Sequence, residues 1–419
     1  MKKAKNLLLI SVGVIILGMS ILYSCKNYTG PSNGQGLFAD KEKANNVDSG
    51  EDSAGTQMLT PDSQRVVVWA DSGIIPALTV MKDNILIAAV GSKTKGQLLI
   101  KESKDNGKNW TEVNAPSIGT DLNNSYVHPF FINCHNGDIL LGVSTTNASQ
   151  NSLYLYRSTD GKTWNQELTN IVLPNKLTNF QTKPLDNKNA IVTYGNGIAL
   201  KHGTNTSKNT LLFPYYYKTK IEVQNGQIQG SVATMISTDD GKSWQRYGND
   251  RGGYVSYISK FIELNDGNIL YFMNDASRRV ACFVSTDCGK TDTEKTPFTS
   301  GAHNEDKIEY FDFARYEFDG RDIKGAEYAL MVFSTDKTSY SVKMTTDDFN
   351  KGQKNKSGTY LGGGSKVIAA NLTKPSAIYP TITVLKDGTI ATLAAEDDGM
   401  VFRRFELNWF LEDELWMEQ

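Results

Sequence analysis

The stretch Ser237–Trp244, STDDGKSW, is a short polar turn that ends in a tryptophan and lies between two strand-like segments. In such a turn, aspartate and serine side chains bond to nearby backbone N–H groups, glycine takes the position with positive φ, and the tryptophan packs under the turn. The pattern therefore predicts a β-hairpin. Weaker copies share this layout: SKDNGKNW from residue 103, STDGKTW from 158, STDCGKT from 285 and the degenerate TTDDF from 345.

The repetition of this turn predicts an architecture as well as a hairpin. Successive copies begin 55, 79, 48 and 60 residues apart. These steps are close to the ~40–50 residues of a four-stranded propeller blade plus insertions. β-branched and aromatic runs dominate the rest of the chain, and helical periodicity is nearly absent, so we expect an all-β fold. The ring should close by placing the first strand, near 66–69, in one blade with the last, near 401–407.

The N-terminus reads as an export signal. Three lysines at positions 2, 3 and 5 precede an apolar run from Leu7 to Tyr23, which stops just before Cys25. The residues before Cys25 resemble the lipobox of bacterial lipoproteins, in which the cysteine becomes the lipidated first residue of the mature chain. Residues 1–25 are thus expected to be a lipoprotein signal peptide, and an uncleaved anchor helix is the alternative. The first interpretation predicts a protein that is lipid-anchored to the bacterial cell envelope, at the outer membrane or cell surface.

Composition bounds the remaining chain. Residues 26–63 are rich in Asn, Gly, Ser, Asp and Lys and predict a disordered tether, whereas 64–419 are expected to form one domain and a monomer. The chain has 44 Lys+Arg and 46 Asp+Glu with both signs mixed, which argues against nucleic-acid binding. Cys134, Cys282 and Cys288 are expected to be structural thiols. Their spacing suggests no metal site, and we predict no cofactor.

Further motifs occur in order along the body: IPAL at 75–78, GNGIAL at 195–200, LLFPY at 211–215, FIELNDG at 261–267, YPTITVLKDGTI at 379–390 and RFELNW at 404–409. Together with the repeated turns, they resemble the motifs of the sialidase (neuraminidase) family, whose turns are known as Asp boxes or BNR repeats. The resemblance covers nearly the whole body. It implies an all-β, six-bladed β-propeller of sialidase type.

The resemblance also implies a catalytic set. Three arginines clamp the sugar carboxylate through bidentate bonds, a tyrosine is the nucleophile, a glutamate accepts its proton and an aspartate is the acid/base. Tyr379 stands at the nucleophile position, but Ile74 and Lys337 occupy two of the arginine positions. After Leu270, where the third is expected, no arginine occurs before Arg278. The segments expected to hold the glutamate and the aspartate, SYIS at 256–259 and GSKTKG at 91–96, contain no carboxylate.

Several residues remain candidates for ligand contact. Tyr379 is a candidate relic nucleophile, and its alternative role is that of a strand tyrosine bonded to backbone. The tyrosines after Pro214 are candidates for stacking on a sugar ring, although strand alternation predicts that at least one is core. Each of the other candidates could instead have a purely structural role. Besides Tyr379, the candidate ligand-binding residues are Lys337, Arg278, Tyr215, Tyr216, His128 and Glu396. Glu396 lies one position from the family glutamate that orients the first clamp arginine.

Three functions follow from these expectations. Loss of an acid or a base typically lowers a rate by ~10²–10⁴-fold. We therefore expect a sialidase-like surface lipoprotein that recognises sialic-acid-type or other host glycans with a degenerate hydrolytic site. An active exo-α-sialidase, a glycoside hydrolase that cleaves terminal sialic acids, is the first alternative. An adhesive or structural surface lipoprotein is the second.

Overall fold

The computed structural model describes residues 58–411 apart from 71–74, 93–96, 119–125, 147–150, 172–189, 193, 203–208, 224–226, 255–257, 275–279, 292, 298–307, 319–327, 346–364 and 376. Met58–Gln419 forms one compact unit. The expected signal peptide, the lipidation candidate Cys25 and residues 26–57 of the expected tether lie outside the described residues. The last residues of that tether, 58–63, are instead part of the compact unit, where Pro61 and Asp62 bond to Arg403. Within the described part, no helix is long and apolar enough to cross a membrane.

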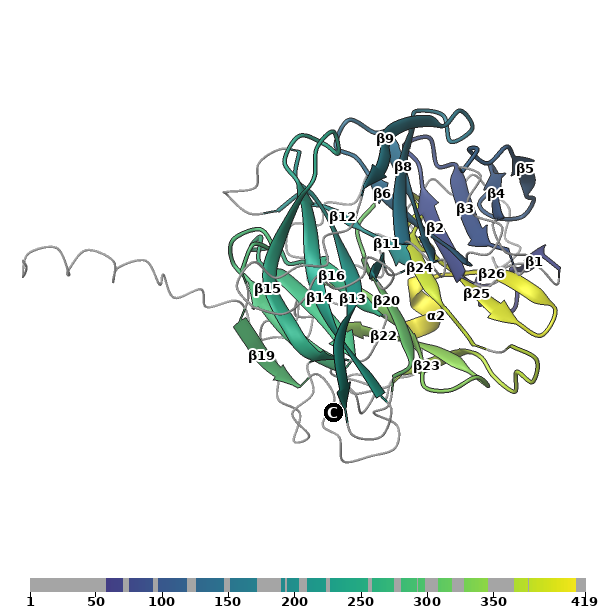
Figure 1. Ribbon diagram of the computed structural model, residues 1–419. Helices are drawn as coiled ribbons and strands as arrows, with labels where there is room; N and C mark the ends of the chain where they lie inside the picture. Colours follow the sequence, from purple (N-terminus) through teal and green to yellow (C-terminus); the bar gives the residue numbers. More distant parts are fainter. Residues whose placement is uncertain are drawn as a thin grey trace, which may run out of the picture. The chain divides into compact units, whose positions relative to one another are not determined.

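The described chain folds into six sheets, the blades of a propeller, whose strands pair antiparallel except for one short parallel pair (Figure 1). We number the blades by the order of their innermost strands. Blade 1 contains β2 (Ile75–Val80), β3 (Leu86–Gly91), β4 (Leu98–Ser103) and β5 (Thr111–Val113). Blade 2 contains β6 (Tyr126–Asn133), β7 (Ile139–Thr146), β8 (Asn151–Ser158) and β9 (Asn165–Ile171), with β11 (Gly195–Asn196) added in parallel to β6. Blade 3 contains β10 (Ala190–Val192), β12 (Ile198–Ala199), β13 (Leu211–Val223), β14 (Gln227–Ser237) and β15 (Gln245–Tyr254).

The second half of the chain builds the other three blades. Blade 4 contains β16 (Ser259–Glu263), β17 (Ile269–Asn274), β18 (Val280–Ser285) and β19 (Thr293–Pro297). Blade 5 contains β20 (Tyr310–Arg315), β21 (Ala329–Ser334), β22 (Tyr340–Thr345) and β23 (Lys366–Ala369). Blade 6 contains β24 (Thr381–Val384), β25 (Ile390–Glu396), β26 (Gly399–Phe405) and β1 (Arg65–Trp69). A short helix, α2 (Leu407–Leu411), follows.

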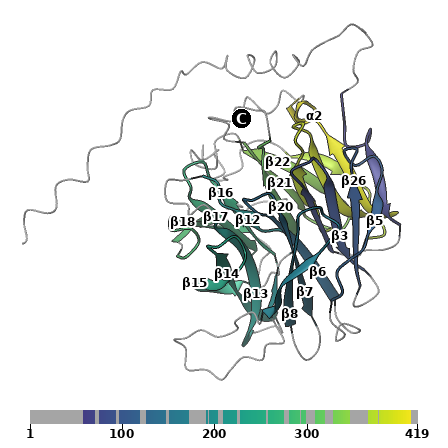
Figure 2. The same ribbon diagram turned by 90° about the horizontal axis from the view of Figure 1, so that it is seen from above.

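The blades close into a ring. Innermost strands of neighbouring blades contact each other: β24 contacts β2, β2 contacts β6, β16 contacts β20, and β20 contacts β24. Blade 3 is joined to its neighbours through β12, which contacts β6, and β13, which contacts β16. Figure 2 shows β13 and β14, the longest strands, side by side with β15. The six-bladed all-β fold expected from the sequence is thus confirmed.

The ring is closed by the N-terminal strand. β1 pairs antiparallel with β26, with Arg65 opposite Arg403 and Val67 opposite Val401. The first strand of the described chain therefore completes the blade built by the last strands. This is the closure predicted from the sequence, and it leaves no gap between blades 6 and 1.

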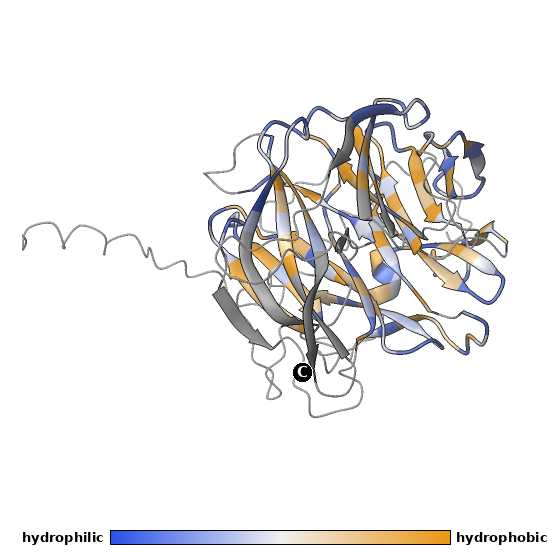
Figure 3. Ribbon diagram, in the orientation of Figure 1, coloured by the Kyte–Doolittle hydropathy of each residue, from blue (hydrophilic) through white to orange (hydrophobic). Residues whose placement is uncertain are grey.

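Apolar side chains fill the spaces between blades. Six buried clusters lie in the described residues, one between each pair of neighbouring blades. Ile87 of blade 1 and Phe131 of blade 2 share one cluster, for example. Because a blade in the ring buries both faces, strands such as β3 and β17 are buried at every position and read as continuous apolar runs. Figure 3 shows this apolar colouring along the strands.

The Asp boxes adopt the predicted turn. In Ser237–Trp244, Ser237 Oγ donates to Asp239 at 2.7 Å and accepts from Gly241 N at 2.8 Å, while Asp239 accepts from Ser243 N at 2.8 Å. Gly241 has φ +91°, and Trp244 Nε1 donates to Gly241 O at 3.1 Å. The copies beginning at 103, 158 and 285 repeat the serine–aspartate and glycine N–serine bonds. Most of the degenerate fifth copy lies outside the described residues.

Each box glycine also lies against the preceding blade. A Cβ added to Gly107 would lie 2.1 Å from the Phe402 ring, and one added to Gly241 would lie 2.6 Å from Leu140 Cδ1. Gly161 and Gly289 face side chains of blades 1 and 3 in the same way. The boxes therefore act at blade interfaces, where the glycine is required both for its backbone angle and for the close approach.

We expect Gly241→Ala to lower the free energy of unfolding by about 1–3 kcal/mol, because it combines an unfavourable positive φ with a clash against Leu140. Urea unfolding measures the effect. Gly137→Ala is the matched control, since Gly137 has the same φ of +91° but its added Cβ would meet only the flexible Lys82 side chain at 3.4 Å. Equal losses in the two variants would contradict a role for Gly241 in blade packing.

Candidate functional site

Tyr379 lies in a group of three tyrosines contributed by separate elements. It lies two residues before β24, and its ring centroid is 4.2 Å from that of Tyr310, the first residue of β20. Tyr194, between β10 and β11, makes an edge-to-face ring contact with Tyr379, with the ring centroids 5.4 Å apart. Tyr379 and Tyr310 are half-buried, whereas Tyr194 is only 2% exposed. Tyr379 thus retains partial access to solvent at the end of the ring where the innermost strands begin, which we call the candidate face.

Ile258 and Asn274 lie at this end of blade 4. Ile258 directly precedes β16, in the segment expected to hold the glutamate base, and is 3% exposed. Asn274 ends β17, in the segment expected to hold a clamp arginine, and is 2% exposed. Its Nδ2 donates to Ile308 O at 2.7 Å and to Glu309 O at 3.2 Å. An aliphatic side chain cannot accept a phenol proton, and an amide bonded to two carbonyls cannot replace a guanidinium fork.

Three further parts of the expected set are outside the described residues. Ile74, at the first clamp position, lies in the segment 71–74. The segment 93–96, within the stretch expected to hold the acid/base aspartate, and the candidate Arg278 are also not described. Lys337 is exposed in the turn between β21 and β22, at the same end of blade 5 as the start of β20. Asp336 accepts from Thr338 N at 2.7 Å in that turn.

The expectation that Tyr215 stacks on a sugar is wrong. Tyr215 is fully buried in the cluster between blades 2 and 3, and its hydroxyl accepts from Arg246 Nε at 2.9 Å. Tyr216 is paired through its backbone in β13, and its side chain lies outside the described residues. His128 is half-buried in β6, where desolvation lowers its pKa to about 4. His128 is therefore neutral at pH 7 and offers no charge to an acidic ligand.

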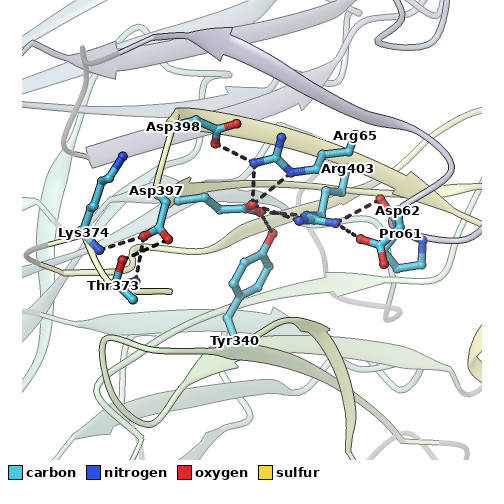
Figure 4. A network of polar contacts seen from close by, with 10 residues as sticks. Pro61, Asp62, Arg65, Tyr340, Thr373, Lys374, Asp397, Asp398 and Arg403 are labelled. Atoms are coloured by element: carbon cyan, nitrogen blue, oxygen red, sulfur yellow. Dashed lines mark hydrogen bonds and ion pairs between the residues drawn. The ribbon is translucent and has the colours of Figure 1, made fainter. Parts of the chain in front are cut away.

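Glu396 belongs to a cluster that anchors β1. Figure 4 shows its partners Arg65, Tyr340 and Arg403. Its carboxylate accepts from Arg403 Nε at 2.7 Å, from Arg65 at 3.0 Å and from the Tyr340 hydroxyl at 2.9 Å. The Glu396 side chain is 1% exposed, and burial beside this carboxylate raises the pKa of Tyr340 well above its usual value. Arg403 also bonds to the Pro61 carbonyl and to Asp62. Every polar contact described for Glu396 goes to this cluster, so it ties the first strand to blades 5 and 6.

A second buried ionic group lies on the inner strands, next to the three tyrosines. Lys260 of β16 and Asp312 of β20 form an ion pair at 3.2 Å, with side chains 1% and 2% exposed. Asp312 also accepts from Thr381 Oγ1 of β24 at 2.6 Å. Burial lowers the pKa of Lys260, and the Asp312 charge partly offsets this effect. We call this group the axial cluster. Sequence reasoning missed it, although charged residues inside otherwise apolar strands, SKFIE and YFDFAR, are its signal.

The described residues contain no group of three or more histidine, cysteine or acidic side chains that could hold a metal ion. Cys134, Cys282 and Cys288 are free thiols. Burial raises the pKa of Cys134 to about 12, so this thiol is inert at neutral pH.

Comparison with known proteins places these features in context. Residues 75–361 match the family model for a BNR repeat-like domain. A sialidase of Micromonospora viridifaciens is 24% identical over 370 residues, which cover 80% of this chain and 51% of that protein. The chain thus spans about half the length of this relative.

Solved sialidases have the same fold. A Hadza microbial sialidase superposes with a TM-score of 0.58 at 17% identity, covering 81% of this chain and 66% of that one. A leech intramolecular trans-sialidase superposes with a TM-score of 0.59 at 13% identity, covering 84% of this chain and 70% of that one.

Proposed function

Because this chain belongs to the family of BNR repeat-like domains, we propose that it is a sialidase-like protein that recognises sialic-acid-type or other host glycans without hydrolysing them. It is held at the bacterial cell envelope by a lipid on Cys25. The leech trans-sialidase, which is similar in fold, was solved with 2,7-anhydro-Neu5Ac. We propose the glycan class on the basis of this similarity in fold, and the loss of hydrolysis on the basis of the residues that stand at the expected catalytic positions of this chain.

The observation that carries the proposal is the contrast around Tyr379. The half-buried Tyr379–Tyr310 pair offers aromatic surface of the kind that packs on a sugar ring. The neighbouring Ile258 and Asn274 are buried, and neither supplies the base or the clamp that turnover needs. Loss of a general base alone typically lowers a rate by ~10²–10⁴-fold. Binding through shape and aromatic contact needs neither group, so recognition survives where hydrolysis does not.

Two assays on the same protein separate recognition from turnover. We expect the full chain to be retained on a glycan array and to release no fluorophore from a fluorogenic α-sialoside above background. Tyr379→Ala should weaken retention by about tenfold or more, because it removes the aromatic contact. Tyr247→Ala is the matched control, since Tyr247 lies on the outer strand β15 of blade 3 and should leave retention unchanged.

The other outcomes of these assays identify the alternative functions. Fluorophore release that is abolished by Tyr379→Phe would establish an active exo-α-sialidase and overturn the proposal. No retention on any glycan, with a protein partner recovered instead, would favour an adhesive or structural surface lipoprotein.

A further inference from the structure

Tyr194 contacts the ring of Tyr379 through its own ring, and it bonds to the next residue, Pro380, through its hydroxyl group. The two rings are in edge-to-face contact, with centroids 5.4 Å apart. The hydroxyl, which is buried, lies 3.3 Å from the carbonyl of Pro380, the residue after Tyr379, and 3.1 Å from the carbonyl of Phe311. The Tyr194 hydroxyl thus links β20 to Pro380, the residue that lies between Tyr379 and β24.

The Lys260–Asp312 ion pair contacts Tyr194 through Lys260. Lys260 Nζ donates to the Tyr194 carbonyl and lies 4.5 Å from the centroid of its ring, over the aromatic face. A buried cation in this position gains both a hydrogen bond and a cation–π contact. The backbone fits closely, because a Cβ added to Gly195, at φ +88°, would lie 2.2 Å from Lys260 Nζ. Both the positive φ and this short distance favour glycine at position 195.

Asp312 continues the contacts onto the strand that follows Tyr379. Its Oδ2 accepts from Thr381 Oγ1 at 2.6 Å and from Ile382 N at 3.4 Å. Residues 380, 381 and 382 are therefore each bonded either to Tyr194 or to Asp312. Three consecutive residues after Tyr379 are held by one buried polar group, whereas Tyr379 itself is half-buried.

We propose that Tyr194, braced by the Lys260–Asp312 pair, is a positioning residue that holds the Tyr379 side chain in one orientation at the candidate face. A buried ion pair seldom adds net stability, because replacing it with apolar side chains of similar volume often leaves the free energy of unfolding unchanged or raises it. Its hydrogen bonds, however, fix direction as apolar contacts do not. The use of Tyr379 for a ligand rests on the proposed function, but its orientation by Tyr194 does not.

The orientation is tested without any ligand. 3-Fluorotyrosine is placed at position 379 alone, and its ¹⁹F NMR signal is recorded in the full chain. We expect one narrow resonance in the unmodified background. Tyr194→Phe should shift and broaden it, because the hydroxyl that holds the Pro380 carbonyl is lost. Thr381→Val should do the same and Thr381→Ser should restore the narrow signal, because serine keeps the hydroxyl that bonds Asp312.

A matched control separates positioning from general stability. Tyr340→Phe removes another buried tyrosine hydroxyl, which donates to Glu396 in the cluster around β1. It should lower stability but leave the resonance at position 379 unchanged. If Tyr194→Phe and Thr381→Val leave that resonance unchanged, or if Tyr340→Phe alters it equally, the proposal is overturned. Should Tyr194→Phe fail to fold, the Thr381 pair of variants decides the question alone.

A second readout separates this proposal from the proposed function. With 3′-sialyllactose as the probe, Tyr194→Phe should weaken affinity by about fivefold to tenfold through the loss of one directing hydrogen bond. A changed ¹⁹F signal with no binding of 3′-sialyllactose by the parent chain would support the positioning role and count against sialic acid recognition. If the parent chain binds 3′-sialyllactose and Tyr194→Phe changes the ¹⁹F signal but not the affinity, the orientation of Tyr379 does not serve ligand binding.

Discussion

Replacing Lys260 with methionine should lower the free energy of unfolding by about 3–5 kcal/mol, because removing one partner of a buried ion pair leaves an uncompensated charge. Asp312 would keep its bonds to Thr381 and Ile382 but lose its counterion in a site where its side chain is 2% exposed. The Tyr194 carbonyl would lose its donor as well. Guanidinium unfolding monitored by tryptophan fluorescence gives the change in free energy.

The double variant Lys260→Met/Asp312→Leu is the informative partner of this measurement. It removes both charges, so most of the lost stability should return, as it commonly does when a buried pair is replaced by apolar residues. Lys101→Met is the control. Lys101 also donates to a backbone carbonyl, that of Val68, but no acidic partner is described for it. If Lys260→Met lowers the free energy of unfolding no more than Lys101→Met does, the Lys260–Asp312 ion pair does not contribute the stability proposed for it.

The second large effect is expected at the closure of the ring. Glu396→Gln should also cost about 3–5 kcal/mol, since it removes the only buried charge described opposite Arg403, whose side chain is 6% exposed. The amide of glutamine would also turn a donor toward Arg65, Arg403 or Tyr340, which all donate to Glu396. The loss should appear first at β1, so hydrogen exchange should accelerate in Arg65–Trp69 before it does in blades 2 to 4.

Asp398→Asn is the control for Glu396→Gln. Asp398 also pairs with Arg65, but its side chain is 46% exposed, and exposed pairs are worth about 0–1 kcal/mol. A small loss in Asp398→Asn together with a large one in Glu396→Gln would establish that burial sets the strength of this cluster. Similar small losses in both would mean that β1 is held by its strand pairing and apolar contacts instead.

The two clusters differ in what they hold. The cluster around Glu396 ties the ends of the described chain together, because Arg65 and Asp62 come from its start and Glu396 and Arg403 from its last blade. The axial cluster ties three innermost strands, β16, β20 and β24, beneath Tyr379. We therefore expect substitutions at Glu396 to affect mainly the integrity of the ring, and substitutions at Tyr194 to affect mainly the candidate face.

Much of the fold could be predicted from local sequence. The Asp-box turn depends on side chains within eight residues of one another, so its serine, aspartate and glycine can be recognised in the sequence without a partner elsewhere. The closure of the ring follows from the need to cover strand edges, and β1 pairs with β26 as expected. Tyr379 could be singled out because the motif around it, YPTITVLKDGTI, is contiguous.

The roles of other residues depended on partners far away in the chain. Tyr215 follows Phe213 and Pro214 in an aromatic run that fits a sugar platform equally well, and only its burial against blade 2 makes it a core residue. Glu396 lies near a family position, yet its partners Arg65 and Tyr340 are 331 and 56 residues away. Contacts over such separations are set by how the blades pack, which no local pattern encodes.

By itself, the sequence determined the repeated turn, the all-β ring and the persistence of one tyrosine at the candidate face, because each depends on short-range chemistry that recurs or is contiguous. Only the tertiary structure decided what surrounds that tyrosine. Tyr194, Lys260 and Asp312 come from three separate parts of the chain and meet at the innermost strands, where exclusion of water strengthens their hydrogen bonds and makes their charges dependent on one another.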